Sequence, residues 1–338
     1  MNRDANAQGA ASTLNLGAKR IVVTGGAGFL GSVVVRKLRD RGCREIVVPR
    51  RAHCDLSRRS DVLRLLDHTQ PHVILHLAAT VDNPAERSDA AASFCNNVLM
   101  TTQLIDAAWR HGVKKMVCLG SASSYPAAAP IPLREDELFS GLPESSRIAH
   151  GIAKRLPIIQ AQAYRKQYGF NCICLVPTNF YGPGDNFDAQ TRYVIPSLIE
   201  KFVAAVESGV PEITLGGSGT STRDFLHVDD CAEGILLATE RYNGAEPLNL
   251  GSGSEIRISE LARKIAALAG YSGRMTWDRA RPDGPVRRVL DIARARRELG
   301  FTPKRALDEG LSETMNWYRT MRYTRASGEQ AEAVASAS

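Results

Sequence analysis

A glycine-rich segment near the N-terminus has the residue types and spacing of a phosphate-binding loop. Residues 24–31 read TGGAGFLG, after an apolar run typical of a buried strand and before the helical pattern of residues 29–41. A tight turn, a close approach of backbone to pyrophosphate and close helix–strand packing each require a glycine, and the helix N-terminus supplies amide donors. The segment predicts dinucleotide binding through Gly25, Gly28, Phe29, Leu30 and Gly31.

The residues after the second expected strand, 45–48, bear on which dinucleotide fits. An acidic residue there would bond the ribose 2′-hydroxyl of NAD, but the chain continues Pro-Arg-Arg-Ala-His. Arg50 and Arg51 could pair with a 2′-phosphate, which favours NADP, or they could be surface charges. NAD therefore stays open, and the adenine is expected near Asp55 and Leu56.

Two further strand ends carry candidate residues. The third strand ends in His76-Leu77-Ala78-Ala79, where small residues would let the strand end lie against the cofactor. His76 could act as a base, although a histidine inside a buried strand is more often a core residue. The fourth strand ends in a serine-rich turn, and Ser121 and Ser123 are candidates to bond a substrate hydroxyl or carbonyl.

These motifs, with others further along, resemble the extended short-chain dehydrogenase/reductases of the nucleotide-sugar epimerase/dehydratase family, and within it the GDP-L-fucose synthase group. The resemblance rests on residues 24–31, 76–79, 119–126, 177–186, 194–196, 217–230, 249–253 and 282–284. It implies a nicotinamide cofactor and a nucleoside diphosphate sugar as substrate. It also implies a homodimer.

The resemblance breaks where the family carries Tyr-x-x-x-Lys. This chain has His150 and Lys154 at that spacing, which still places both on one helix face. The family's tyrosine exchanges the proton of the sugar hydroxyl, its lysine holds the nicotinamide ribose, and its serine aligns with Ser121. Imidazole has an ordinary pKa of ~6.5 against ~10 for phenol, so His150 can exchange a proton without the help that tyrosine needs.

Two other positions depart from the GDP-L-fucose synthase group. That group uses a cysteine and a histidine to epimerise C3 and C5, and here Ser123 and Tyr193 align with them. A serine hydroxyl is a far weaker acid than a thiol, so we expect 3,5-epimerisation to be lost. Tyr193 could instead supply the phenol that position 150 lacks.

The resemblance also assigns a substrate site. Asn179 and Arg223 are the expected diphosphate contacts, with Pro177 and Asn179 also near the cofactor. The nucleotide pocket is expected to be lined and closed by Val194, Lys201, Asp283 and Arg287. The alternative for Arg223 and Arg287 is an ordinary ion pair with a nearby aspartate.

Composition and charge narrow the classes of function that the chain can have. The chain has 338 residues, and 43 basic against 36 acidic residues give a net charge of +7. These charges are scattered rather than clustered, which argues against nucleic acid and favours a basic cleft for an anionic small molecule. No apolar run is long enough for a membrane span, and the first 19 residues lack the core of a secretory signal.

The seven cysteines have no metal-site or disulfide spacing, so no metal and a reducing, cytoplasmic setting are expected. Cys172 and Cys174 alternate in an apolar run and should be buried on one side of a strand.

Alternating apolar runs and helical patterns predict an α/β fold, a Rossmann-type doubly wound parallel sheet with a smaller C-terminal substrate-binding lobe. We expect flexible tails at residues 1–18 and 323–338, and a Rossmann domain at 19–180 to which 225–252 return. Residues 181–224 and 253–322 are expected to form the other lobe. The leading functional hypothesis is a C4 epimerase working through a 4-keto sugar. The alternatives are an NADPH-dependent 4-keto-sugar reductase and a binding protein with a degraded site.

Overall fold

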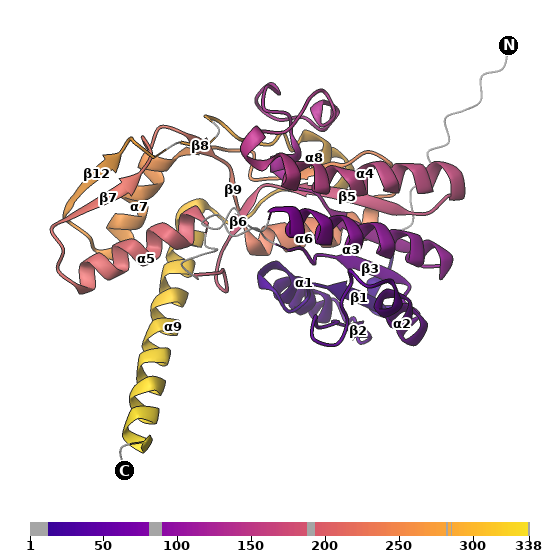
Figure 1. Cartoon of the computed structure of the whole chain (residues 1–338), viewed down its shortest axis with the longest axis horizontal. Coiled ribbons are helices and arrows are strands. Elements are labelled where there is room, and N and C mark those ends of the chain that lie inside the picture. The colour runs from indigo at the N-terminus through magenta and orange to yellow at the C-terminus, as the bar shows by residue number, and fades with distance from the viewer. Residues whose placement is uncertain (1–12, 81–89, 188–192, 282, 285, 337–338) are drawn as a thin grey trace.

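A six-stranded parallel sheet is the centre of the computed structural model, which describes residues 13–80, 90–187, 193–281, 283–284 and 286–336. Within these residues the strand order is β10-β5-β4-β3-β1-β2 (Figure 1). The strands are β1 (Ile21–Thr24), β2 (Ile46–Val47), β3 (Val73–His76), β4 (Lys115–Leu119), β5 (Cys172–Pro177) and β10 (Leu248–Leu250). The order reverses between β1 and β3, which confirms the doubly wound fold and creates a crevice at their carboxyl ends.

Helices cover both faces of the sheet, which explains why its strands are apolar without alternation. Along β1, Val22 belongs to the core beneath α2 (Arg59–Thr69), α3 (Ala90–Arg110) and α4 (Ile148–Tyr168). The next residue, Val23, belongs to the core beneath α1 (Phe29–Asp40) and α6 (Val228–Arg241).

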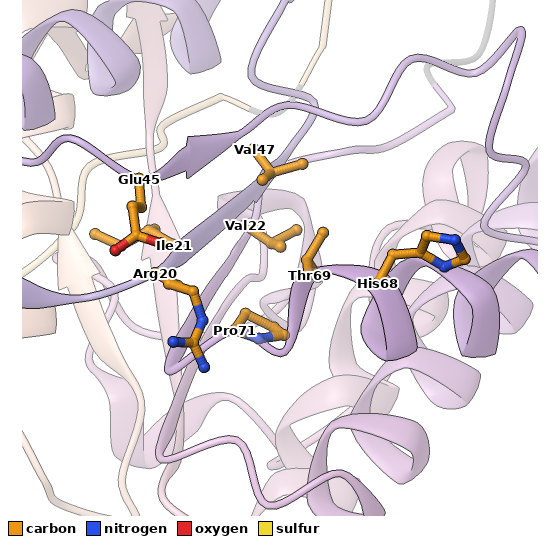
Figure 2. Close-up of a pocket in the computed structure, with 8 residues that line it drawn as sticks. All are labelled: Arg20, Ile21, Val22, Glu45, Val47, His68, Thr69 and Pro71. Carbon is orange, nitrogen blue, oxygen red and sulfur yellow. The ribbon is translucent and has the colours of Figure 1, made fainter.

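A hollow lies at the amino edge of the sheet. Its volume is about 220 Å³. Figure 2 shows side chains that line it, including Arg20 and Ile21 at the start of β1 and Thr69 and Pro71 before β3. Because the strands are parallel, it lies at the opposite edge from the crevice and takes no part in the candidate site.

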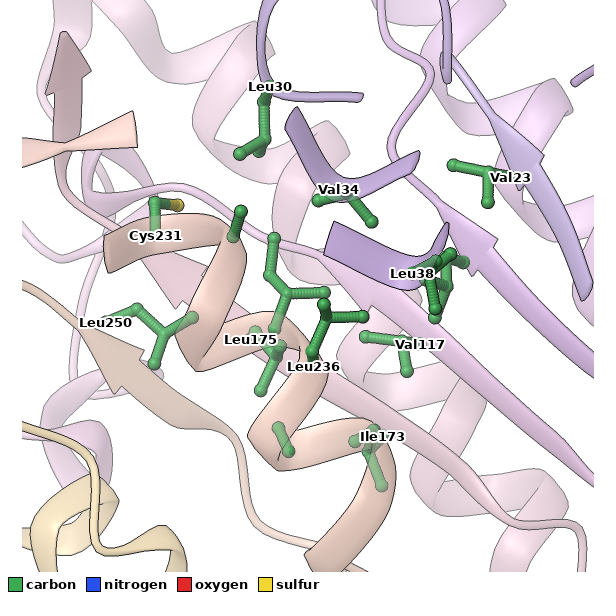
Figure 3. Packing of buried hydrophobic residues seen from close by; sticks show 14 of the residues in the cluster. Val23, Leu30, Val34, Leu38, Val117, Ile173, Leu175, Cys231, Leu236 and Leu250 are labelled. Carbon is green, nitrogen blue, oxygen red and sulfur yellow. The ribbon is translucent and has the colours of Figure 1, made fainter. Parts of the chain in front are cut away.

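The larger apolar core packs α1 and α6 together on the sheet. Figure 3 shows Leu30, Val34 and Leu38 of α1 on the side that faces α6, which carries Cys231 and Leu236, with Val117 of β4 near Leu38 and Leu236. This contact ties residues 228–250 to the cofactor-binding half, since β10 then pairs with β5 in parallel register.

The three cysteines of β4 and β5 lie in the other core. Cys118, Cys172 and Cys174 are all buried there, which confirms the expectation for the latter two. The Sγ atoms of Cys118 and Cys172 are 3.9 Å apart.

A second lobe packs around its own apolar core, which includes Phe202 and Ile265. Its helices are α5 (Val194–Glu207), α7 (Ile258–Ala269) and the start of α9 (Leu307–Ser336), and its parallel strand pair is β7 (Glu212–Gly216) with β12 (Arg274–Asp278). Two small pairs connect it to the sheet: β6 (Asn179–Tyr181) with β9 (Phe225–His227), and β8 (Thr222–Arg223) with β11 (Ile256–Arg257). Helix α8 (Ala293–Leu299) returns to α6 and β10.

Both expected tails contain regular contacts or secondary structure where they are described. The amide of Leu14 donates to the Glu240 carbonyl at 2.9 Å, and Leu16 is buried in the core beneath α1 and α6. These two leucines anchor residues 13–18, because an apolar side chain is stabilised by leaving water. At the other end α9 continues to Ser336, since alanine and glutamate are strong helix formers.

Among the described residues, no helix combines the length and the apolar character that crossing a bilayer requires.

Candidate active site

The glycine loop forms a backbone cradle at the crevice between β1 and β3. Gly25 has φ +70°, and a Cβ there would lie 2.7 Å from the amide nitrogen of Ala78 after β3. A Cβ at Gly31 would overlap the carbonyl oxygen of Gly25. Gly28 caps α1 and has no side chain, so the first amides of the helix face the crevice. The cradle fits the pyrophosphate of a dinucleotide, and the backbone of Leu77 and Ala78 lies against Gly25. Ala79 follows them in the chain.

His76 is a hydrogen-bonded core residue. Its Nδ1 lies 2.7 Å from Thr24 Oγ1 and its Nε2 lies 3.0 Å from Thr101 Oγ1. Burial lowers the pKa of His76 to about 4, which keeps the ring neutral. Both ring nitrogens are engaged, so the core interpretation is favoured over a catalytic one.

The adenosine end has no carboxylate at the end of β2. The side chain of Val48 packs against Gly26, so the chain after β2 passes beside the glycine loop. Arg50 and Arg51 follow, both exposed. Asp55 accepts bonds from the amide and hydroxyl of Ser57, which lower its pKa, and Leu56 is buried.

The reactive end is assembled where α4 meets the turn after β4. Ser121 caps the 3-10 turn Ala122–Ser124, and its Oγ lies 2.7 Å from Ser123 Oγ. A Cβ at Gly151 would lie 2.7 Å from the Ser123 carbonyl oxygen, so only glycine lets α4 approach so closely. This contact places the half-buried His150, on the first turn of α4, beside the serine turn.

Lys154 lies one turn further along α4. Its Nζ donates to the Leu119 carbonyl at 3.5 Å, at the end of β4. Burial lowers the pKa of Lys154 to about 8, while Cys118 acts in the opposite direction. The ammonium therefore lies in a poorly solvated position at the carboxyl edge of the sheet.

Tyr193 and Val194 lie at the start of α5, in the second lobe. Tyr193 is the N-cap residue of that helix, and both side chains are exposed. Residues 188–192, which precede them, lie outside the described residues.

The remaining expected substrate residues have partners within the protein. Pro177 ends β5, and Asn179 Nδ2 donates to the Asp224 carbonyl at 3.3 Å. Lys201 donates to the Thr214 carbonyl at 2.6 Å. Asp283 accepts bonds from the amide and the hydroxyl of Ser218.

The side chains of Arg287 and Arg288 point to different sides of the segment that carries them. Arg287 is exposed and pairs with Glu255, whereas the expected alternative was an ion pair with an aspartate. Arg288 is largely buried beside Glu144, with Nη2 3.5 Å from Oε2. The segment is extended, because Val286 and Arg288 accept bonds from Thr222 and Asp224 on one neighbouring strand. Side chains alternate between the two sides of an extended segment, so neighbouring residues face opposite ways. This alternation is the feature of the sequence that could have distinguished Arg287 from Arg288.

Arg223 is the centre of a cationic cluster that sequence reasoning missed. A Cβ at Gly284 would lie 2.7 Å from Arg223 Nη2, so the guanidinium lies against Gly284. Burial lowers the pKa of Arg288 to about 10, and repulsion from Arg223 and Arg147 adds to this. Glu144 opposes the effect. A half-buried excess of positive charge of this kind suits a phosphate-bearing ligand.

Comparison with known proteins agrees with this geometry. Residues 21–251 match the model of the NAD dependent epimerase/dehydratase family. The chain belongs to that family. Membership confirms the expected Rossmann-type fold and nicotinamide cofactor.

Individual relatives cover nearly the whole chain. GDP-L-fucose synthase 1 of Arabidopsis thaliana is 38% identical over 300 residues, 88% of this chain and 93% of that protein. The structure of a GDP-6-OMe-4-keto-L-xylo-heptose reductase from C. jejuni matches with a TM-score of 0.85 at 26% identity, over 92% of this chain and all (100%) of that one. A GDP-L-fucose synthetase from Naegleria fowleri bound to NADP matches with a TM-score of 0.82 at 26% identity, over 90% and 95%.

In the described part of the chain, no three His, Cys, Asp or Glu side chains gather in a way that could hold a metal ion.

The glycine cradle can be tested by adding one methyl group. We expect Gly31→Ala to weaken NADPH binding at least about 10-fold, because the Cβ would displace the Gly25 carbonyl and with it the cradle. Fluorescence titration measures the affinity. Ser32→Ala, at the next and exposed position of α1, is the control and should bind normally. Equal affinity in the Gly31 variant would contradict the assignment.

The pKa of Lys154 predicts an alkaline limit to activity. The ammonium loses its proton as the pH rises through about 8, so kcat/KM should fall there. Lys154→Arg stays charged, and its alkaline limb should move to higher pH even where its rate is lower. A wild-type profile that stays flat well above this pKa would show that the charge of Lys154 is not needed.

Proposed function

We propose that this protein reduces the 4-keto group of a GDP-linked sugar with NADPH. The observation that carries the proposal is the joining of Ser121, His150 and Lys154 at the carboxyl edge of the sheet, beside the glycine cradle. The named relatives are GDP-sugar synthases and a 4-keto-sugar reductase, which favours this reading over the C4 epimerase expected first. The exposed Arg50 and Arg51, without an acid after β2, support NADP.

Each residue of the reactive end has a proposed role. The Ser121 hydroxyl donates a hydrogen bond to the C4 oxygen of the sugar, and Ser123 orients that hydroxyl through the 2.7 Å contact between their oxygens. The bound cofactor supplies the hydride that C4 receives. His150 supplies the proton that the C4 oxygen takes up, which completes the alcohol. Lys154 binds the nicotinamide ribose.

The rest of the substrate is assigned to the second lobe. Asn179 and Arg223 bind the diphosphate, and Val194, Lys201 and Asp283 line the nucleotide pocket. Arg288 is assigned a place beside the bound diphosphate, because it is largely buried and close to Arg223. Arg287 is not, because it pairs with Glu255. We propose that 3,5-epimerisation is absent, because Ser123 and Tyr193 stand where the fucose synthases have a thiol and an imidazole.

His150 is the most direct test of the mechanism. We expect His150→Phe to lower kcat for reduction of a GDP-4-keto-6-deoxy sugar by about 100-fold or more, since the proton donor is removed. Oxidation of NADPH followed by absorbance measures the rate, and His150→Tyr should recover part of it. The control is His111→Phe, because His111 pairs with Asp67 and has no role in the proposed site. Full activity in the His150→Phe variant would transfer the role to Tyr193, which Tyr193→Phe would then reveal.

Solvent labelling separates reduction from epimerisation. We expect a product made in D₂O to carry no solvent deuterium at C3 or C5. The reason is that Ser123 and Tyr193 replace the thiol and the imidazole that exchange protons at these carbons in the fucose synthases. Mass spectrometry with NMR locates the label. Deuterium at C3 or C5 would contradict the proposed loss of 3,5-epimerisation. Tight NADPH binding with no reduction of any GDP-, UDP-, ADP- or dTDP-linked keto sugar would favour the degraded-site alternative.

A further inference from the structure

Helix α4 carries the proposed reactive residues on one face and a second pair of residues on the face beside it. Gly151 and Arg155 are four residues apart, so they lie on one face of the helix. His150 and Lys154, each one residue earlier, lie on the neighbouring face. Because Gly151 has no side chain, its face lies directly against the serine turn, residues 121–124. Contacts on that face therefore set how His150 and Lys154 lie relative to the serines.

The side chain of Arg155 binds two segments at once. Its Nε donates to the Ser124 carbonyl at 2.6 Å, and its Nη1 donates to the Gly141 carbonyl at 2.7 Å. The guanidinium carbon lies over the Phe139 ring, 5.8 Å from its centre. A guanidinium is a planar fork of donors, so one side chain can join two carbonyls from different segments. Arg155 thus connects α4 to the serine turn and to the turn at residues 139–141.

Arg155 is a buried cation without a matching negative charge. Its relative exposure is 6%, and Nη2 has no hydrogen-bond partner among the described residues. Burial lowers the pKa of Arg155, and none of the carboxylates in the described part of the chain opposes this. An apolar side chain would fill such a position without the cost of burying a charge. What the arginine contributes is its pair of carbonyl contacts.

The serine turn is hydrogen-bonded internally, so a contact at Ser124 also acts on Ser121. The Ser124 amide donates to the Ser121 carbonyl at 2.9 Å, and the Ser123 amide donates to Ser121 Oγ at 3.2 Å. The two hydroxyl oxygens of Ser121 and Ser123 are 2.7 Å apart. A displacement of the Ser124 carbonyl would therefore carry the Ser121 hydroxyl with it.

We propose that Arg155 is a positioning residue that fixes the serine pair relative to His150 and Lys154. The inference rests on the proposed function for the reaction that these groups perform. Arg155 acts through the Ser124 carbonyl rather than by contact with the substrate. Groups that act on the same C4 oxygen must be held in a narrow range of geometries, and a rigid bond between their two elements achieves this.

Kinetics test the positioning role. We expect Arg155→Met to lower kcat by about 100-fold, because a displacement of about 1 Å at a reacting group has an effect of that size. The dissociation constant of NADPH should change far less, since the glycine cradle is not involved. Arg155→Lys keeps a charged donor that can reach one carbonyl, so it should recover part of kcat.

The matched control is Arg165→Met. Arg165 lies near the end of the same helix and also binds a backbone carbonyl, that of Cys172 at 3.3 Å. This variant should keep the wild-type kcat. A wild-type kcat in Arg155→Met, or an equal loss in Arg165→Met, would overturn the proposal. Should Arg155→Met not fold, the same comparison is made with Arg155→Lys, whose kcat should lie below that of the wild-type protein.

Hydrogen exchange separates the positioning role from the reaction. Without substrate, Arg155→Met should exchange faster at the amides of residues 121–125 and 139–144, while peptides from β1 and α1 should exchange as in the wild-type protein. Mass spectrometry of peptides measures both. Faster exchange throughout the sheet, or none at the serine turn, would overturn the proposal. If the local change is seen but the wild-type protein reduces no keto sugar, the proposed function fails and the contact of Arg155 with the serine turn keeps its positioning role.

Discussion

The close contact between α4 and the turn after β4 is the constraint on which the rest of the site depends. At Gly151 a side chain would strike both the Ser123 carbonyl and Pro143, with Cβ distances of 2.7 and 2.8 Å. Because nothing but glycine fits, the helix approaches until its stripe of His150 and Lys154 lies at the carboxyl edge of the sheet. The same approach brings the turn at 144–147 against the second lobe.

A second feature of the site is positive charge at poorly solvated positions. Lys154 and Arg288 both have a pKa lowered by burial, to about 8 and about 10. Keeping these groups charged away from water costs free energy. At Arg288 the ion pair with Glu144 offsets part of that cost, and at Lys154 the Leu119 carbonyl accepts a hydrogen bond from the ammonium.

Much of the cofactor half could be predicted along the chain. A strand, a glycine loop and a helix are local features, so the cradle at Gly25 and Gly31 followed from spacing alone. The fully apolar strands indicated a sheet covered on both faces. The tails could not be judged this way, because Leu16 gains its stability from α1 and α6, whose packing together is a tertiary event.

The sequence by itself determined which chemical groups the protein has: a glycine cradle, a serine pair and a histidine four residues before a lysine. These are covalent facts, and periodicity converts them into faces of strands and helices. Only the tertiary structure decided that His76 serves the core, that Arg288 rather than Arg287 turns inward, and that Arg288 meets Glu144 of the turn before α4. Such choices depend on which segments pack against each other, and segments more than a hundred residues apart leave no trace of that in local spacing.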